Sequence, residues 1–155
     1  VSEFSGKRLS DRFENQNADN FLYVAIHELV HTQQKQEGLT LLGQSLCEGA
    51  CDFIAELVMD TTLQLTHLKY GRIHEEEIKA KFKNEMFRTS FDGWLYSGNS
   101  SQAVSDLGYF MGYVICKSYY NKNKNKHRAI RDIIQLRYSD KHEIKKFLRQ
   151  SGYRF

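Results

Sequence analysis

The chain of 155 residues contains no proline, although average usage of about 5% would supply roughly eight. Proline interrupts helices more strongly than any other residue, because its ring lacks an N–H donor and clashes with the preceding turn. A chain without it has few obligatory helix breaks and no rigid linkers. With 41% hydrophobic and 26% charged residues, the composition is that of a globular protein. These features favour a helical domain that buries its core without disulfides.

Apolar residues recur with helical spacing, and capping residues mark where the expected helices begin. The first helix is expected from Asp19 or Asn20 to about Gln36, with Gly38 just past its end. The later helices are expected over 44–69, 73–89, 106–120 (capped by Ser105 or Asp106), 129–136 and 140–151, the last capped by Asp140 and followed by Gly152. Residues 1–17 are polar, with at most a strand remnant over 1–4. We therefore expect a mainly α, compact single domain over 1–155, with 1–17 at its periphery.

Three further features limit the class of protein. No run of eighteen apolar residues occurs, so we expect no transmembrane segment. The chain opens with Val1 and without a basic-then-apolar leader, so we expect a shortened chain whose start says nothing of its compartment. Three cysteines allow at most one disulfide, which excludes a disulfide-stapled scaffold. The compartment and the oligomeric state stay open.

Charge is distributed unevenly along the chain. Residues 117–155 contain twelve Lys or Arg against three Asp or Glu, and residues 1–116 contain ten against sixteen. A basic C-terminal region could bind nucleic acid or another anionic surface. The alternative is the solvated face of amphipathic helices. Because the aromatic residues there do not alternate with the basic ones as a base-stacking platform requires, we expect no nucleic-acid partner.

The most informative segment is the sequence HELVH at residues 27–31. Two histidines four residues apart on a helix project from the same face, so the rings of His27 and His31 can converge on one ion. Zinc binds imidazole nitrogen in a tetrahedral shell, and this pair would supply two ligands. Glu28 directly follows the first histidine, where its carboxylate can reach a zinc-bound water and act as the general base. The alternative is a helix whose histidines contact only the core or water.

Three carboxylates, Glu48, Asp52 and Glu56, recur every four residues on the next, otherwise apolar helix. Burying them without partners would be costly, so this side of the helix should face a cation or water. Each step of four residues advances about 6 Å along the helix axis. The path from a zinc ion through a ligating imidazole ring and one hydrogen bond to the acceptor behind the ring has a similar length. We therefore interpret Glu48 as the third zinc ligand and Asp52 as the hydrogen-bond partner of His27. Glu56 is expected at the surface or between helices.

Two cysteines flank the expected third ligand. Cys47 and Cys51 could compete with Glu48 as soft zinc ligands. They lie on different sides of the helix face that carries the three carboxylates, and buried cysteine is usually a small core residue.

A hydrolase also needs a hydrogen-bond donor for the oxyanion that develops during the reaction. Tyr109 and Tyr113 lie four residues apart on one expected helix and are the catalytic candidates for this role. They alternate with Gly108 and Gly112, which would let this helix approach another backbone closely. The alternative is that both tyrosines pack in a helical core. His74 is a further candidate donor.

The segment HELVH followed by Glu48 and Asp52 resembles the gluzincin pattern of zinc metallopeptidases. In thermolysin-like members a glutamate on a second helix is the third zinc ligand, and an aspartate four residues later supports the first histidine. The segments HELVHTQQ, CEGACDFIAELV and SDLGYFMGYVICKSYY together resemble the predicted zinc-dependent proteases related to gliding-motility lipoproteins of bacteria. This resemblance covers scattered blocks of residues 20–155. It implies a zincin-like metallopeptidase domain, a peptide or protein substrate, and a lipoprotein-like parent in the cell envelope.

We therefore predict a helical zinc hydrolase, specifically a metallopeptidase. His27, His31 and Glu48 are expected to bind Zn²⁺, with Glu28 as the general base. Two alternatives stay open. One is a non-catalytic helical module whose structural zinc is closed by four protein ligands. The other is a basic binder of nucleic acid or anionic surfaces that acts through the residues from Lys117 onward.

Overall fold

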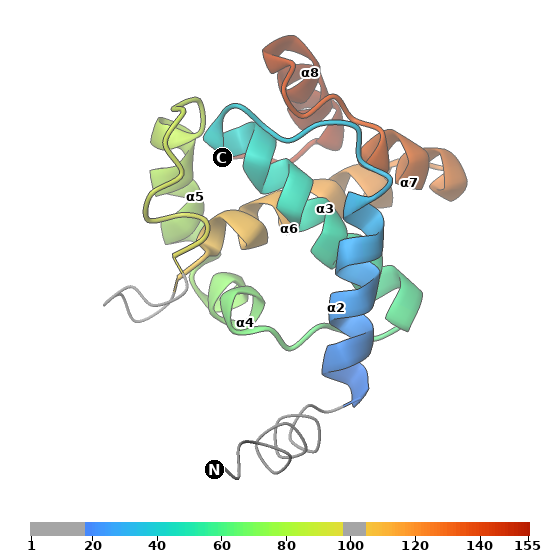
Figure 1. Ribbon diagram of the computed structural model, residues 1–155. Helices are drawn as coiled ribbons and strands as arrows, with labels where there is room; N and C mark the ends of the chain where they lie inside the picture. Colours follow the sequence, from blue (N-terminus) through green and yellow to red (C-terminus); the bar gives the residue numbers. More distant parts are fainter. Residues whose placement is uncertain (1–17, 98–104) are drawn as a thin grey trace, which may run out of the picture.

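The computed structural model describes residues 18–97 and 105–155 (Figure 1). Within these two ranges the chain forms seven helices and no strand. The helices are α2 (Ala18–His31), α3 (Leu41–Met59), α4 (Thr66–Ile73), α5 (Glu75–Glu85), α6 (Leu107–Lys122), α7 (Lys126–Ile134) and α8 (Lys141–Ser151). The expected mainly α fold is confirmed. The strand remnant expected over 1–4 lies outside the described residues.

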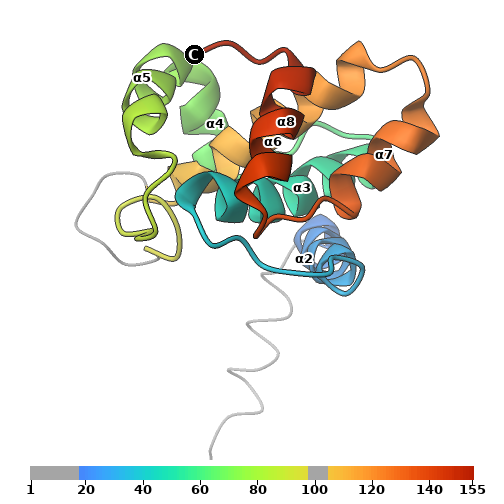
Figure 2. The same ribbon diagram turned by 90° about the horizontal axis from the view of Figure 1, so that it is seen from above.

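Helices α3 and α6 form the central pair of the fold (Figure 1). Helix α2 packs along α3, whereas α4, α5 and α8 pack on α6, and α7 contacts both central helices. Seen from above, α4 and α5 lie toward one end of α6 and α7 toward the other (Figure 2). None of the helices in the described part of the chain has the length and apolar character that a membrane span requires.

The central helices cross where each has a glycine. A Cβ atom on Gly112 of α6 would lie 1.6 Å from the carbonyl oxygen of Ser45 in α3, and one on Gly49 would lie 2.1 Å from the backbone nitrogen of Tyr113. The two backbones can therefore touch only because neither residue has a side chain. The close helix approach expected from the glycines of α6 is confirmed at Gly112.

The first helix is shorter than expected. It ends at His31 rather than near Gln36. Beyond it, the side chain of Gln34 turns back to contact the His31 ring at 2.8 Å and donates to the carbonyl of Cys47, also at 2.8 Å. These contacts with α2 and α3 hold the chain in a turn where the sequence alone favours further helix.

The single helix expected over 44–69 is divided into α3 and α4. Helix α3 ends at Met59, and Asp60 after it adopts the left-handed backbone conformation with φ of 48°. The Glu56 carboxylate then accepts a hydrogen bond from the backbone N–H of Leu63 at 3.0 Å, which fixes the turn. The remaining expected helices correspond to α5, α6, α7 and α8, with ends shifted by up to four residues.

Candidate metal centre

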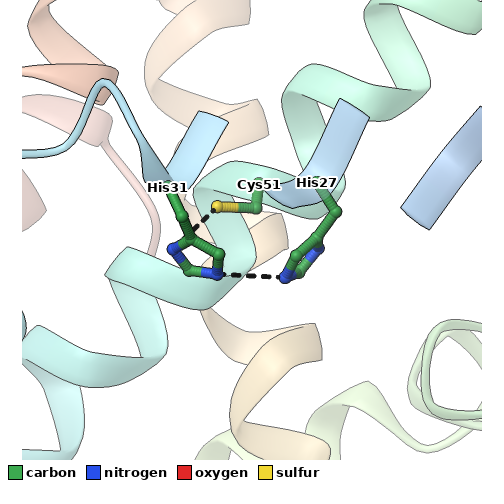
Figure 3. A group of neighbouring side chains, drawn as sticks. All are labelled: His27, His31 and Cys51. Carbon is green, nitrogen blue, oxygen red and sulfur yellow. Dashed lines mark hydrogen bonds between the residues drawn. The ribbon is translucent and has the colours of Figure 1, made fainter. Parts of the chain in front are cut away.

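His27 and His31 lie one turn apart at the end of α2, and their rings meet edge to face beside α3 (Figure 3). Their Nε2 atoms are 3.2 Å apart. With Cys51 of α3 they form a group whose ligand atoms all lie within 4.8 Å of one another, so this group could hold a metal ion. The expected convergence of His27 and His31 is confirmed, and with Cys51 they form a possible metal site.

Cys51 approaches a different ring nitrogen from the one that faces His27 (Figure 3). Its Sγ lies 3.5 Å from His31 Nδ1, whereas His31 Nε2 is the atom next to His27. Burial raises the pKa of the Cys51 thiol, and the nearby Glu48 carboxylate raises it further. The thiolate is the form that binds metal, so Cys51, like the two histidines, would have to lose a proton when a metal binds.

Glu48 of α3 places one carboxylate oxygen beside both histidines. Its Oε2 lies 3.4 Å from His27 Nε2 and 3.3 Å from His31 Nε2. Its Oε1 accepts hydrogen bonds from the Tyr96 hydroxyl at 2.6 Å and from Gln44 Nε2 at 3.2 Å. Burial raises the pKa of Glu48, but the hydrogen bonds from both imidazoles and Tyr96 outweigh it and hold the pKa well below its usual range. Glu48 is therefore ionised, with Oε2 directed at two imidazole nitrogens.

Asp52, one turn after Glu48, is fully buried and accepts three hydrogen bonds. Its Oδ1 lies 2.7 Å from the Tyr23 hydroxyl and 3.0 Å from His27 Nδ1, and its Oδ2 lies 2.8 Å from His67 Nε2. Burial raises the pKa of Asp52, but the hydrogen bonds from His27 and His67 lower it overall. An ionised carboxylate can only accept, so neutral His27 has its proton on Nδ1 and its lone pair on Nε2. The contact expected between Asp52 and His27 is thus present.

Gln34 orients His31 in the same way. Its Oε1 lies 2.8 Å from His31 Nδ1, while its amide nitrogen donates to the Cys47 carbonyl at 2.8 Å. Because an amide oxygen can only accept, neutral His31 also has its proton on Nδ1 and its lone pair on Nε2. Gln34 is not among the residues predicted from the sequence, although its spacing of three from His31 is a usable signal.

The acidic surroundings favour the protonated form of both histidines when no metal is bound. Burial lowers the pKa of His27, but the hydrogen bonds to Asp52 and Glu48 raise it overall to about 9. Interactions with Cys47 and Glu48, opposed by burial, raise the pKa of His31 to about 11. A cation bound between these rings would therefore take the place of protons.

A cleft of about 390 Å³ opens beside this group, and Glu28, His31 and Glu48 are among the residues that line it. Glu28 is exposed, so its carboxylate can reach water in the cleft. The lining of this cleft thus includes the expected general base, Glu28, and two of the three residues expected to bind zinc, His31 and Glu48.

Of the two tyrosines expected to donate to an oxyanion, only Tyr109 lies near the histidines. Its ring centroid is 6.4 Å from that of His27 and 5.5 Å from that of His67. Tyr113 is buried, and its hydroxyl donates to Glu56 at 2.5 Å. Because Glu56 lies two turns past Glu48, about 12 Å along α3, Tyr113 does not have the expected catalytic position. Its hydroxyl instead joins α6 to α3, and Glu56 pairs helices, as expected.

Further side chains that contact the site are absent from the sequence prediction, among them those of Gln44, Tyr23, His67 and Tyr96. Tyr23 precedes His27 by four residues, and this helical spacing is a usable signal. His67 follows the break between α3 and α4, and Tyr96 lies in an irregular segment with φ of 60°, so no periodic pattern indicates either one. His74, the other candidate donor, stacks on a tyrosine of α4 with a centroid distance of 4.1 Å.

Comparisons with protein-family models, with curated proteins and with solved structures found no match to this chain. What the site can do therefore follows from its own side chains. Two imidazole nitrogens, a carboxylate oxygen and a thiol lie close together, and a second carboxylate, that of Glu28, lies in the adjoining cleft.

Proposed function

We propose that this chain is a zinc-dependent hydrolase, specifically a metallopeptidase, with Zn²⁺ bound by His27, His31 and Glu48. One observation carries the proposal: His27 Nε2, His31 Nε2 and Glu48 Oε2 form a triangle with sides of 3.2, 3.3 and 3.4 Å. Zinc bonds of 2.0–2.2 Å at tetrahedral angles separate ligand atoms by roughly 3.3–3.6 Å. The three atoms therefore match three corners of a tetrahedral zinc shell.

Glu48 suits the third corner better than Cys51. The Cys51 sulfur faces His31 Nδ1, a nitrogen that already contacts Gln34, whereas Glu48 Oε2 faces both Nε2 atoms. In the metal-free protein the pKa of Glu48 is lowered and that of Cys51 is raised, so of these two only the thiol must lose a proton before it binds zinc. Three protein ligands leave one position for water or substrate, which is the arrangement of catalytic zinc sites.

Each side chain of the site has a role in this proposal. A bound zinc ion supplies a Lewis acid and lowers the pKa of water. Glu28 accepts the proton of the attacking water and passes it to the leaving amine. Burial, together with the Glu48 carboxylate, raises the pKa of Tyr109, so its hydroxyl stays protonated and can donate to the developing oxyanion. The sequence resemblance to zinc proteases supports a peptide bond as the substrate.

A structural zinc site is the second candidate function. It is favoured by the position of Cys51, whose sulfur could close the shell as a fourth protein ligand after a small movement toward the histidines. A closed shell has no position for water or substrate, so this candidate predicts bound zinc without hydrolysis.

The general base provides the experiment that separates the two. Wild-type protein and a Glu28→Gln variant, each loaded with one equivalent of zinc, are assayed on a library of quenched fluorescent peptides. We expect the variant to keep its zinc and to lose at least about a hundredfold in kcat/KM, because it has lost the proton acceptor. Glu37→Gln is the matched control, since Glu37 lines the same cleft and has no proposed role. Unchanged activity of Glu28→Gln, or a zinc-loaded wild type that cleaves no peptide, would contradict the proposal.

A further inference from the structure

A second cleft, of about 440 Å³, lies between α7 and α8. The buried side chains of Leu136 and Phe147 contribute apolar surface to it. Five cationic side chains line this basic cleft, against two carboxylates. The cations are those of Lys35, Arg128, Arg131, Arg137 and Lys146, and the carboxylates are those of Asp132 and Glu143. A concave surface with this excess of positive charge suits an anionic ligand.

Both carboxylates of the basic cleft already have cationic partners. Asp132 lies 3.6 Å from Arg128 Nε, and Glu143 lies 3.6 Å from an Arg137 nitrogen. The other three cations are exposed and have no carboxylate within 4.0 Å among the described residues: Lys35, Arg131 and Lys146. These three are therefore available to a ligand.

The basic cleft adjoins the cleft of the candidate metal centre. Lys35 lines both of them. On either side of Lys35, the segment between α2 and α3 contacts the segment between α7 and α8: Gln34 lies 3.3 Å from the Tyr138 hydroxyl, and Ser139 donates to Gln36. The two connecting segments run close together in both views (Figures 1 and 2). A polypeptide advances about 3.3 Å per residue when extended, so a few residues can pass from one cleft into the other.

We infer that the substrate is a polypeptide with an acidic segment. Its acidic side chains lie in the basic cleft, opposite Lys35, Arg131 and Lys146, while the peptide bond to be cleaved lies at the metal centre. The inference rests on the proposed function, because that function identifies the adjoining cleft as the place where an amide is hydrolysed. It adds a substrate class that the metal centre alone does not indicate.

Nucleic acid fits the basic cleft less well than an acidic peptide. The aromatic rings at this cleft, Tyr119 and Phe147, stack on each other at a centroid distance of 4.3 Å. The Tyr119 hydroxyl also donates to Asp132 at 3.0 Å, which holds the ring in place. Neither ring is therefore arranged to stack on a splayed base, as single-strand binding requires.

Binding of a fluorescent glutamate decamer to the zinc-loaded full chain, measured by anisotropy, tests the inference. The test variant is Lys35→Glu/Arg131→Glu/Lys146→Glu. The control is Lys83→Glu/Lys124→Glu/Arg149→Glu, which makes the same charge change at exposed residues outside both clefts. We expect affinity to fall at least about tenfold in the test variant, because three ion pairs become repulsive, and less than about threefold in the control.

Two results of this experiment would overturn the inference. Equal losses in the test and control variants would mean that the peptide senses only net charge. Stronger displacement of the decamer by an equally charged oligothymidylate than by unlabelled oligoglutamate would reassign the basic cleft to nucleic acid. Circular dichroism shows whether charge reversal disturbs α7 or α8. If it does, the same two sets of residues are changed to alanine instead, and the expected difference in affinity between the two variants is smaller.

A glutamate decamer with a hydroxamate group at one end or the other tests the path between the clefts. Hydroxamate chelates zinc, so we expect one of the two probes to bind the zinc-loaded protein at least about tenfold more tightly than the parent decamer. This gain should disappear when a chelator removes the metal. Acetohydroxamate alone separates two failures. If it does not bind the zinc-loaded protein, the proposed metal centre is wrong. If it binds but neither linked probe gains affinity, the continuous substrate path is wrong.

Discussion

Helices α3 and α8 place their polar side chains in opposite ways. Helix α8 buries Ile144, Phe147 and Ser151 along one side and leaves most of its charged residues toward solvent. Helix α3 is buried continuously from Leu41 to Ala55, and the buried stretch contains Gln44, Ser45, Glu48 and Asp52. The first pattern is that of an ordinary amphipathic surface helix. The second places two ionised carboxylates inside the protein.

The difference shows which part of the chain is built around a site. Burying a carboxylate costs desolvation energy that ion pairing often fails to recover, so such groups are weak evidence for a stabilising role. Yet Glu48 and Asp52 are each surrounded by donors from other elements, including His27 of α2, His67 of α4 and Tyr96. Their arrangement is explained by the metal centre that we propose, whereas the buried side of α8 is explained by packing alone.

The largest difference between α3 and α8 is expected in zinc affinity when one carboxylate is removed from each helix. We expect Glu48→Gln to weaken zinc binding by more than about a hundredfold, because a lost ligand should cost more than the ten- to hundredfold that a lost partner of a ligand costs. Glu143→Gln on α8 should leave zinc affinity unchanged. Competition against a chromophoric chelator measures both variants. Similar affinities would remove Glu48 from the metal centre.

A smaller effect is expected when the residue behind His27 is changed. Asp52→Asn keeps the shape of the side chain but replaces one acceptor oxygen with an NH₂ group, so the donors of Tyr23, His27 and His67 cannot all be satisfied. We expect zinc affinity to fall about ten- to hundredfold while the helical circular dichroism spectrum is retained. Asp132→Asn is the control, since Asp132 pairs with Arg128 on α7. Wild-type affinity in Asp52→Asn would show that Asp52 does not support the zinc ligands.

The effect of pH on stability should depend on whether zinc is bound at the metal centre. In the metal-free protein the pKa of His27 is raised from 6.5 to about 9, so folding favours its charged form. This contribution to stability is fully present below pH 6.5 and is lost as the pH rises through about 9. Because zinc takes the place of the proton, we expect the zinc-loaded protein to lack this decline. Urea unfolding between pH 6.5 and about 9.5, with and without zinc, measures the difference. The same decline in both forms would contradict the prediction.

The smallest effect is expected from a helix cap in the C-terminal region. The side chain of Asn125 accepts a hydrogen bond from the backbone N–H of Arg128 at 2.9 Å and so caps α7. Asn125→Ala should lower the free energy of unfolding by about 1 kcal/mol, measured by urea denaturation, without changing zinc affinity. A loss of zinc affinity would show that α7 and the metal centre are not independent.

The same contrast explains what could be predicted from the sequence. Asp140 caps α8 as expected, accepting from the backbone N–H groups of His142 and Glu143, and Gly152 follows the helix with φ of 72°. These features depend on residues close together in the chain. At the metal centre, helical spacing likewise predicted that His27 and His31 would converge.

Contacts between distant segments could not be predicted in this way. The relative position of α3 and α6 depends on the glycine crossing, which places Tyr109 near the histidines and Tyr113 beside Glu56, although both tyrosines share one face of α6. Tyr96 reaches Glu48 from an irregular segment that has no periodic pattern. Such residues are fixed by tertiary packing, and sequence spacing does not indicate it.

X-ray absorption at the zinc K-edge, on protein loaded with one equivalent of zinc, tests the ligand set most directly. We predict only nitrogen and oxygen neighbours at about 2.0–2.2 Å, with the outer-shell scattering of two imidazole rings, as expected for His27, His31 and Glu48. A sulfur neighbour at about 2.3 Å would place Cys51 in the shell and contradict the proposed centre.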